Sequence, residues 1–306
     1  MTNAETKEHG FIDAHVHLQD RRFGETWDEV GQYLACAKEC GIERFLCVSA
    51  SPADWNRTAE LARRFDSIYP SFGVHPWSCR RIQGDWLGAL TMFLDSYVAK
   101  DGVTKAALGE VGLDFAVRQC DETLQKEQEE LFLAQLQLAN DRAIPVTLHS
   151  VRANFRILEI MKYFSRVPAW ILHSWQATRQ EIERALDYGA FFSFSNRSVT
   201  PRARFSRECV AAVPRDRILL ESDGPTLLPP DGYGQQDDSA PRQTTIVAPV
   251  TSNGARLAEP GSLLRTAEEI ARIRKVSTDD FFRQLAINEK RFLANWPKKS
   301  ETSKNS

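Results

Sequence analysis

The stretch Phe11-Ile12-Asp13-Ala14-His15-Val16-His17 combines a run of strand-forming residues with two histidines separated by a single residue. Residues two apart on a β-strand point to the same side, so both imidazoles can face one metal ion. Neutral imidazole suits zinc and similar ions, and carboxylates can complete such a coordination shell. The stretch therefore predicts a strand whose carboxyl end carries part of a metal site.

Seven more apolar runs follow this first one, and longer amphipathic stretches separate them. The expected strands are residues 11–17, 44–50, 69–75, 105–110, 144–149, 169–173, 190–195 and 217–223. The expected helices are residues 26–40, 53–65, 85–100, 121–142, 152–164, 177–188 and 202–213, with two closing helices at 262–275 and 278–295. This alternation is typical of parallel β-α units joined by right-handed crossovers.

Eight successive β-α units predict an α/β protein with a closed (β/α)8 barrel of the TIM type. A doubly wound open sheet is the alternative, but the first strand-to-helix turn lacks the glycine-rich phosphate loop typical of that fold. We predict a single hydrolase domain over residues 11–296, with flexible ends at 1–10 and 297–306. The long connection 224–261 is rich in Pro, Gly, Gln and Asp, which is typical of a functional or disordered loop.

The overall composition is that of an ordinary globular protein. The chain has 306 residues and a formal net charge of -2, so it lacks the basic footprint of a protein that coats nucleic acid. A nuclease is not excluded, because a bound metal can supply positive charge locally. No signal peptide or membrane-spanning run is evident, and the six cysteines form no C-x-x-C pair. We therefore expect reduced thiols and a cytoplasmic location, with the nucleus as the alternative.

Potential metal ligands gather at the carboxyl ends of the expected strands, which share one face of a barrel where active sites of this fold lie. The candidates are His15, His17, Glu110, His149, His173 and Asp223. Glu110 could bridge two ions, and Asp223 could serve both as a ligand and as general base. A lone histidine is more often a core residue, and Asp223 could instead cap a helix. Asp13 could orient a ligand histidine or belong to a turn.

Further polar and aromatic residues are expected around the same rim. His75 lies outside the candidate ligand set and could contact substrate or transfer a proton, or could merely pack beside Pro76. Four arginines follow the seventh expected strand, where they could bind a phosphate or form a solvated helix face. They are Arg197, Arg202, Arg204 and Arg207. Trp77 and Trp175 follow two strands and could stack on a base or wall the pocket.

Six motifs, in this order and spacing, resemble those of the TatD family of metal-dependent hydrolases. They are Phe11 to His17 as quoted above, Gly73-Val74-His75-Pro76, Gly109-Glu110-Val111-Gly112-Leu113-Asp114, Pro145-Val146-Thr147-Leu148-His149-Ser150, Ile171-Leu172-His173, and Leu219-Leu220-Glu221-Ser222-Asp223-Gly224-Pro225. The closing helices, with Asn288, also fit. The resemblance implies a TIM-type barrel, a divalent-metal site held by the six candidate ligands, and phosphodiester hydrolysis, often at DNA ends.

The chain departs from the family pattern mainly in its loops. Ser174-Trp175-Gln176 replaces a Cys-Phe-type sequence, and the usual arginine after the fifth strand is displaced by one position, to Arg152. Ala258-Glu259-Pro260 stands where the family has Asn-Glu-Pro, and the loop over residues 231–254 is expanded. These changes bear on substrate choice, because the loops of a barrel set it.

These features predict a divalent-metal-dependent hydrolase, specifically a phosphodiesterase or deoxyribonuclease that acts on DNA ends or another phosphodiester. One or two ions of Zn, Mg, Mn or a similar metal are expected, with no organic cofactor. Asp223, Glu110 and His75 are the predicted catalytic residues. The predicted substrate contacts are His75, Arg152, Arg197 and Trp175. The alternatives are an amidohydrolase that cleaves a C–N or C–O bond, and a scaffold or adaptor with little turnover.

Overall fold

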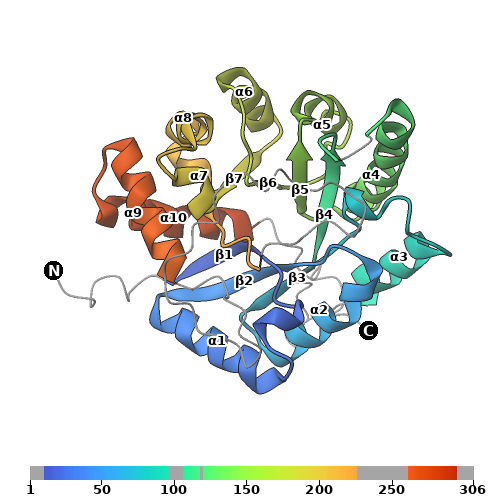
Figure 1. Ribbon diagram of the computed structural model, residues 1–306, viewed down its shortest axis with the longest axis horizontal. Helices are drawn as coiled ribbons and strands as arrows, with labels where there is room; N and C mark the ends of the chain where they lie inside the picture. The colour runs from blue at the N-terminus through green and yellow to red at the C-terminus, as the bar shows by residue number, and fades with distance from the viewer. Residues whose placement is uncertain (1–9, 97–105, 118–119, 226–260, 295–306) are drawn as a thin grey trace, which may run out of the picture.

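The computed structural model describes residues 10–96, 106–117, 120–225 and 261–294. Over these ranges the chain forms a closed barrel of eight parallel strands in sequential order, which confirms the predicted (β/α)8 fold (Figure 1). The strands are β1 (Phe11–Val16), β2 (Ile42–Val48), β3 (Ile68–Phe72), β4 (Ala107–Asp114), β5 (Val146–Val151), β6 (Trp170–His173), β7 (Ala190–Phe194) and β8 (Ile218–Leu220). Asp13 of β1 pairs with Leu220 of β8 and closes the barrel.

Helices surround the strands, as Figure 1 shows. They are α1 (Trp27–Glu39), α2 (Pro52–Arg64), α3 (Trp86–Ser96), α4 (Glu122–Arg142), α5 (Asn154–Met161), α6 (Arg179–Asp187), α7 (Asn196–Val199), α8 (Arg204–Ala212), α9 (Gly261–Arg274) and α10 (Thr278–Leu293), with short 3-10 turns η2 (Arg21–Phe23), η3 (Pro76–Ser78) and η4 (Arg215–Arg217). Thr26 and Thr178 begin α1 and α6 with reciprocal capping boxes. Across the described ranges, no helix is long and apolar enough to cross a membrane.

Several predicted boundaries are wrong near the carboxyl end of the barrel. β4 does not end at Glu110 but continues to Asp114, because Val111 and Gly112 keep their pairing with β5. β8 ends at Leu220, so Asp223 lies in the following segment, where a left-handed φ of 50° turns the chain. His75 likewise lies beyond β3 and caps η3, and α7 was not predicted. The predicted flexible ends and the long loop after β8 lie almost entirely outside the described residues.

The amino end of the barrel is closed by α10. Phe292 packs against Phe191 inside the barrel, with 5.6 Å between ring centroids. The amide of Asn288 donates to the carbonyl oxygens of Arg215 and Ile218, at 2.8 Å each. Glu289 accepts the backbone N–H of Ile12 at 2.5 Å. With this end filled, the opposite, carboxyl end is left to carry a site.

Glu289 makes the stability of this closure depend on pH. Burial outweighs the nearby Arg44 guanidinium and raises the pKa of Glu289 from 4.5 to about 8. Between pH 4.5 and about 8 the folded protein therefore keeps a proton on Glu289 that the unfolded chain releases. The stability that this proton contributes is complete below pH 4.5 and is lost as the pH rises through about 8. As the pH rises through this window, the free energy of unfolding of wild type should fall relative to that of Glu289→Gln by up to about 1.4 kcal/mol per pH unit. Urea unfolding at pH 5.5 and pH 8.5 measures the difference in free energy of unfolding between the two proteins. The same difference at both pH values would refute the raised pKa of Glu289.

Candidate metal centre

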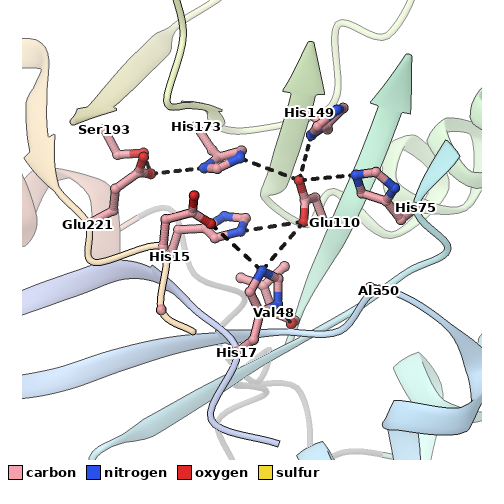
Figure 2. A network of polar contacts seen from close by, with 12 residues as sticks. His15, His17, Val48, Ala50, His75, Glu110, His149, His173, Ser193 and Glu221 are labelled. Carbon is pink, nitrogen blue, oxygen red and sulfur yellow. Dashed lines mark hydrogen bonds and ion pairs between the residues drawn. The ribbon is translucent and has the colours of Figure 1, made fainter. Parts of the chain in front are cut away.

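The carboxylate of Glu110 lies at the middle of five imidazoles at the carboxyl end of the barrel (Figure 2). Its Oε2 lies 3.5 Å from His15 Nε2 and 3.8 Å from His17 Nε2. Its Oε1 faces the other three rings, at 2.8 Å from His149 Nδ1, 3.4 Å from His173 Nε2 and 3.5 Å from His75 Nε2. One oxygen thus points toward β1 and the other toward the ends of β3, β5 and β6.

The β1 side of the cluster combines His15 and His17 with Asp223. Potential ligand atoms of these three residues all lie within 4.8 Å of one another. The carbonyl of Val48 lies 2.7 Å from His17 Nδ1, which leaves Nε2 to face Glu110 and Asp223. The backbone N–H of Asp223 donates to the carbonyl of His15 at 3.0 Å, so the segment after β8 is attached to β1.

His75 differs from the other imidazoles in the hydrogen bond that it accepts. Its Nδ1 accepts the backbone N–H of Trp77 at 3.2 Å, so in the neutral ring Nε2 carries the proton and donates toward Glu110. Burial and then the neighbouring His149 lower the pKa of His75 to about 4, which keeps the ring neutral. His75, Glu110 and His149 also lie close enough to share an ion. The donor role of Nε2 nevertheless argues for His75 as a hydrogen-bond donor beside the ions.

Two buried carboxylates that sequence reasoning left without a role orient His149 and His173. Asp114 Oδ2 lies 3.2 Å from His149 Nε2, and Glu221 Oε2 lies 3.2 Å from His173 Nδ1. The indole N–H of Trp77 donates to Asp114 at 2.7 Å, and the hydroxyl of Ser193 donates to Glu221. Both residues lie inside motifs quoted above, Asp114 at the end of Gly109 to Asp114 and Glu221 within Leu219 to Pro225, and that membership was the available signal, although it does not reveal their histidine partners.

The charges of the cluster are strongly coupled. Burial alone would raise the pKa of Glu110, but His75 and His15 outweigh it and hold that pKa well below its usual range. Burial alone would lower the pKa of His149 and His173, yet the neighbouring carboxylates raise them to about 9 and about 10. The pKa of Glu221 falls to about 2, because His173 outweighs its burial. The carboxylates of the centre are therefore ionised, and His149 and His173 would each lose a proton on binding an ion.

The residues fit a divalent ion on the evidence of their unsatisfied polar atoms. Both ring nitrogens of His15 are buried without a hydrogen-bond partner, and so is Oε1 of Glu221. Buried polar atoms are normally satisfied, and a role in binding an ion is one reason for an exception. Imidazoles with carboxylates suit Zn, Mn, Ni and related ions.

Comparisons with known proteins agree with this geometry. Residues 12–294 match the family model of TatD related DNase. The chain belongs to this TatD-related family. It is 31% identical over 222 residues to the 3'-5' ssDNA/RNA exonuclease TatD of Klebsiella pneumoniae (strain 342), covering 72% of this chain and 80% of that protein. The exonuclease of the same name from Erwinia tasmaniensis is 29% identical over 285 residues, or 92% of this chain and 99% of its own length.

Solved structures of TatD proteins share the fold of this family member. A TatD homologue from Escherichia coli K12 superposes with a TM-score of 0.71 at 22% identity, covering 94% of this chain and 97% of its own. A TatD family hydrolase from Entamoeba histolytica gives a TM-score of 0.73 at 18% identity, covering 94% and 98%. At these identities the likeness concerns the fold alone.

The predicted substrate contacts of this TatD-related chain are placed unequally. Arg197, in α7, has its Nη1 3.9 Å from Asp223 Oδ2 and is 58% exposed. Arg152 is exposed directly after β5, three positions beyond His149 in the chain. Trp175 is only 1% exposed and packs against Phe192 at 5.7 Å, so its ring offers no face to a base and belongs to the core. Trp77 is the tryptophan that borders the cluster.

The remaining arginines and Asp13 also have defined places. Arg202 and Arg204 are exposed, whereas Arg207 pairs with Glu269 at 2.5 Å. Asp13 is not a turn residue but lies inside β1. Its carboxylate accepts the backbone N–H of His15 and of Ser222 at 3.3 and 2.9 Å, so it orients backbone and not an imidazole.

Gly112 is required where β4 passes His149. A Cβ at this position would lie 2.0 Å from the carbonyl oxygen of His149, and its φ of +146° is unfavourable for other residues. We expect Gly112→Ala to lower the free energy of unfolding by at least about 2 kcal/mol. Gly31→Ala is the matched control, because its Cβ would meet only the Phe65 ring at 3.8 Å, and alanine in helix α1 is expected to be neutral or stabilising. Equal midpoints in chemical denaturation would contradict the prediction.

Proposed function

We propose that this chain is a divalent-metal-dependent phosphodiesterase that acts at the 3′ ends of single-stranded DNA or RNA. The observation that carries the proposal is the position of Glu110, whose two oxygens face two different groups of histidines. The relatives named as 3'-5' exonucleases support the choice of substrate. The proposal includes a cytoplasmic location, whose ground is the scattered spacing of the six cysteines.

We assign the ligands in two groups that share Glu110. His15, His17 and Asp223 would hold one ion. His149 and His173, whose ring nitrogens both face Oε1 of Glu110, would hold a second. His75 stays outside both groups, because its Nδ1 already accepts a hydrogen bond and its Nε2 donates. When bound, divalent ions such as Zn, Mg or Mn supply positive charge beside the phosphoryl oxygens and make water more acidic.

The chain's own side chains supply the remaining chemistry. Asp223 is 17% exposed, so solvent reaches its carboxylate, which accepts the proton of the attacking water. Arg197 lies beside it with an exposed guanidinium that can make two parallel hydrogen bonds to a phosphate. His75 Nε2 lies 3.5 Å from Glu110 Oε1 and carries a proton that it can donate to a phosphoryl oxygen in place of Glu110.

The proposal is tested with a single-stranded DNA labelled at its 5′ end, so that shortening from the 3′ end gives a ladder. The protein is stripped of metal and then assayed alone, with Mg and with Mn. We expect a ladder only in the reloaded samples. If protein shown by elemental analysis to contain metal cleaves no DNA with any divalent ion, the proposed nuclease function is wrong. Amide and ester substrates would then be tested.

Glu221 is expected to act on metal affinity by orienting His173. Glu221→Gln removes the acceptor charge that keeps the proton on Nδ1 and leaves Nε2 facing Glu110. We expect metal affinity to fall about 10- to 100-fold, the usual cost of losing such an outer partner. Competition with a chromogenic chelator measures it. The matched control is Glu269→Gln in α9, a half-buried glutamate that pairs with Arg207 and Arg272 and with no histidine of the cluster. Equal metal affinities in the two variants would show that Glu221 does not orient a metal ligand.

A further inference from the structure

We propose that a cavity beside the candidate metal centre is a subsite for one nucleobase of the substrate strand, an inference that rests on the proposed nuclease function. The cavity has a volume of about 550 Å³ and lies between the first turn of α2, the end of η3 and the start of α3. Helices α2 and α3 lie next to each other on the barrel (Figure 1). Its walls include Pro52, Ala53, Arg81, Ile82, Asp85 and Trp86.

The cavity and the metal centre share one short segment of chain. His75 donates its backbone N–H to the carbonyl of Ala50 at 2.9 Å, directly before Ser51 and Pro52 in the cavity wall. The carbonyl of His75 accepts the N–H of Ser78, another wall residue, at 2.9 Å. The imidazole of the same His75 lies 3.5 Å from Glu110. A strand whose scissile phosphodiester lies beside the cluster around Glu110 can therefore place a neighbouring nucleotide in this cavity.

The chemistry of the walls favours a base over a phosphate. Trp86 is half-buried and contributes an indole, while Ile82 and Pro52 add apolar surface. Stacking on an aromatic ring is tolerant of base identity, as removal of successive nucleotides requires. The Asp85 carboxylate caps α3 by accepting the N–H of Gly88 at 2.9 Å, and its negative charge disfavours a phosphate in the cavity.

Size and charge support the same occupant. A volume of about 550 Å³ lies within the roughly 300–1,000 Å³ of clefts that hold small organic ligands. Arg81 brings an exposed guanidinium to the wall, and a guanidinium can pair with the phosphate that joins the bound nucleotide to the next. The cavity thus combines an apolar surface for the base with a cation for the backbone.

The test compares a substrate that has a nucleotide next to the scissile phosphodiester with one that has none. One is single-stranded (dT)5, and the other is bis(4-nitrophenyl) phosphate, a diester without nucleotides. For Trp86→Ala we expect KM for (dT)5 to rise roughly 5- to 150-fold, the factor that base–aromatic stacking supplies. The kinetics with the small diester should be unchanged, and Trp86→Phe should recover most of the loss. Equal KM values for (dT)5 in wild type and in folded Trp86→Ala would overturn the subsite.

A second pair of variants keeps the test independent of the core contacts of Trp86. Ala53 is exposed in the first turn of α2, where a glutamate is favourable for the helix. Ala53→Glu and Ala53→Gln both narrow the cavity, and only the first adds a negative charge. We expect both to raise KM for (dT)5, with the larger rise for Ala53→Glu, and to leave the small diester unaffected. If neither variant changes KM for (dT)5, the cavity is not occupied.

Direct binding separates failure of the subsite from failure of the proposed function. Fluorescein-labelled (dT)5 is titrated into the Asp223→Asn protein, with and without Trp86→Ala, and anisotropy is recorded. If Trp86→Ala weakens binding, the subsite is supported even if wild type cleaves neither substrate. The absence of cleavage would then refute only the proposed nuclease function. Binding that is equal in both proteins, together with normal cleavage, would refute only the subsite.

Discussion

Asp223→Asn is expected to lower phosphodiester turnover by about 10²- to 10⁴-fold while the barrel stays folded, the range usual for loss of a general base. A carboxamide cannot accept a proton from water. It has nearly the same shape, and asparagine tolerates the left-handed backbone observed at this position, with φ 50°. The measurement is kcat on the 5′-labelled single-stranded DNA, with far-ultraviolet circular dichroism to establish folding.

The matched control for Asp223→Asn is Asp216→Asn. Asp216 lies in η4 at the amino end of the barrel, where it pairs with Arg291 at 2.5 Å. The control should keep wild-type turnover. Wild-type turnover by Asp223→Asn would show that Asp223 is not the general base. A scaffold with this fold would show no turnover in wild type and would keep its partner binding in both variants, so the experiment also separates that alternative.

Glu110→Gln is expected to remove bound metal and, with it, turnover. The substitution replaces a shared anion by a neutral group whose NH2 would face one of the two histidine groups as a donor. A ligand should matter more than its outer partners, so we expect metal affinity to fall by more than about 100-fold. Elemental analysis after gel filtration gives the number of ions per chain.

Thermal unfolding gives an independent measure of the same loss. An ion that binds only the folded protein stabilises it by about 2.7 kcal/mol at 100 times its Kd. Wild type and the control Glu129→Gln should therefore show a higher Tm with added metal, because Glu129 pairs with Arg156 and is not a candidate ligand. Glu110→Gln should show little change. If Glu110→Gln binds as many ions as wild type and shows the same rise in Tm with added metal, Glu110 is not a ligand shared by the two ions.

The candidate ligands could be predicted because their signals are local. His15 in β1 and His17 directly after it both face Oε2 of Glu110, as the two-residue repeat of a strand predicts, and the alternation of strands and helices predicts the barrel. Once the barrel is assumed, the strand ends meet on one face without further information. The order of the elements and the types of residue near the strand ends therefore sufficed to propose the six candidate ligands, although the exact strand ends at Glu110 and Asp223 were wrong.

Only the tertiary structure decided which residues support those ligands. Glu221 contacts His173 from 48 positions away, and Glu289 reaches Ile12 across 277. Trp77 and Trp175 both follow strand ends, yet one borders the cluster and the other is buried against Phe192. Periodicity predicts the side of a strand on which a residue lies, but not which side chain fills the space opposite. That outcome depends on how helices and loops pack around the closed barrel, and no local pattern in the sequence encodes it.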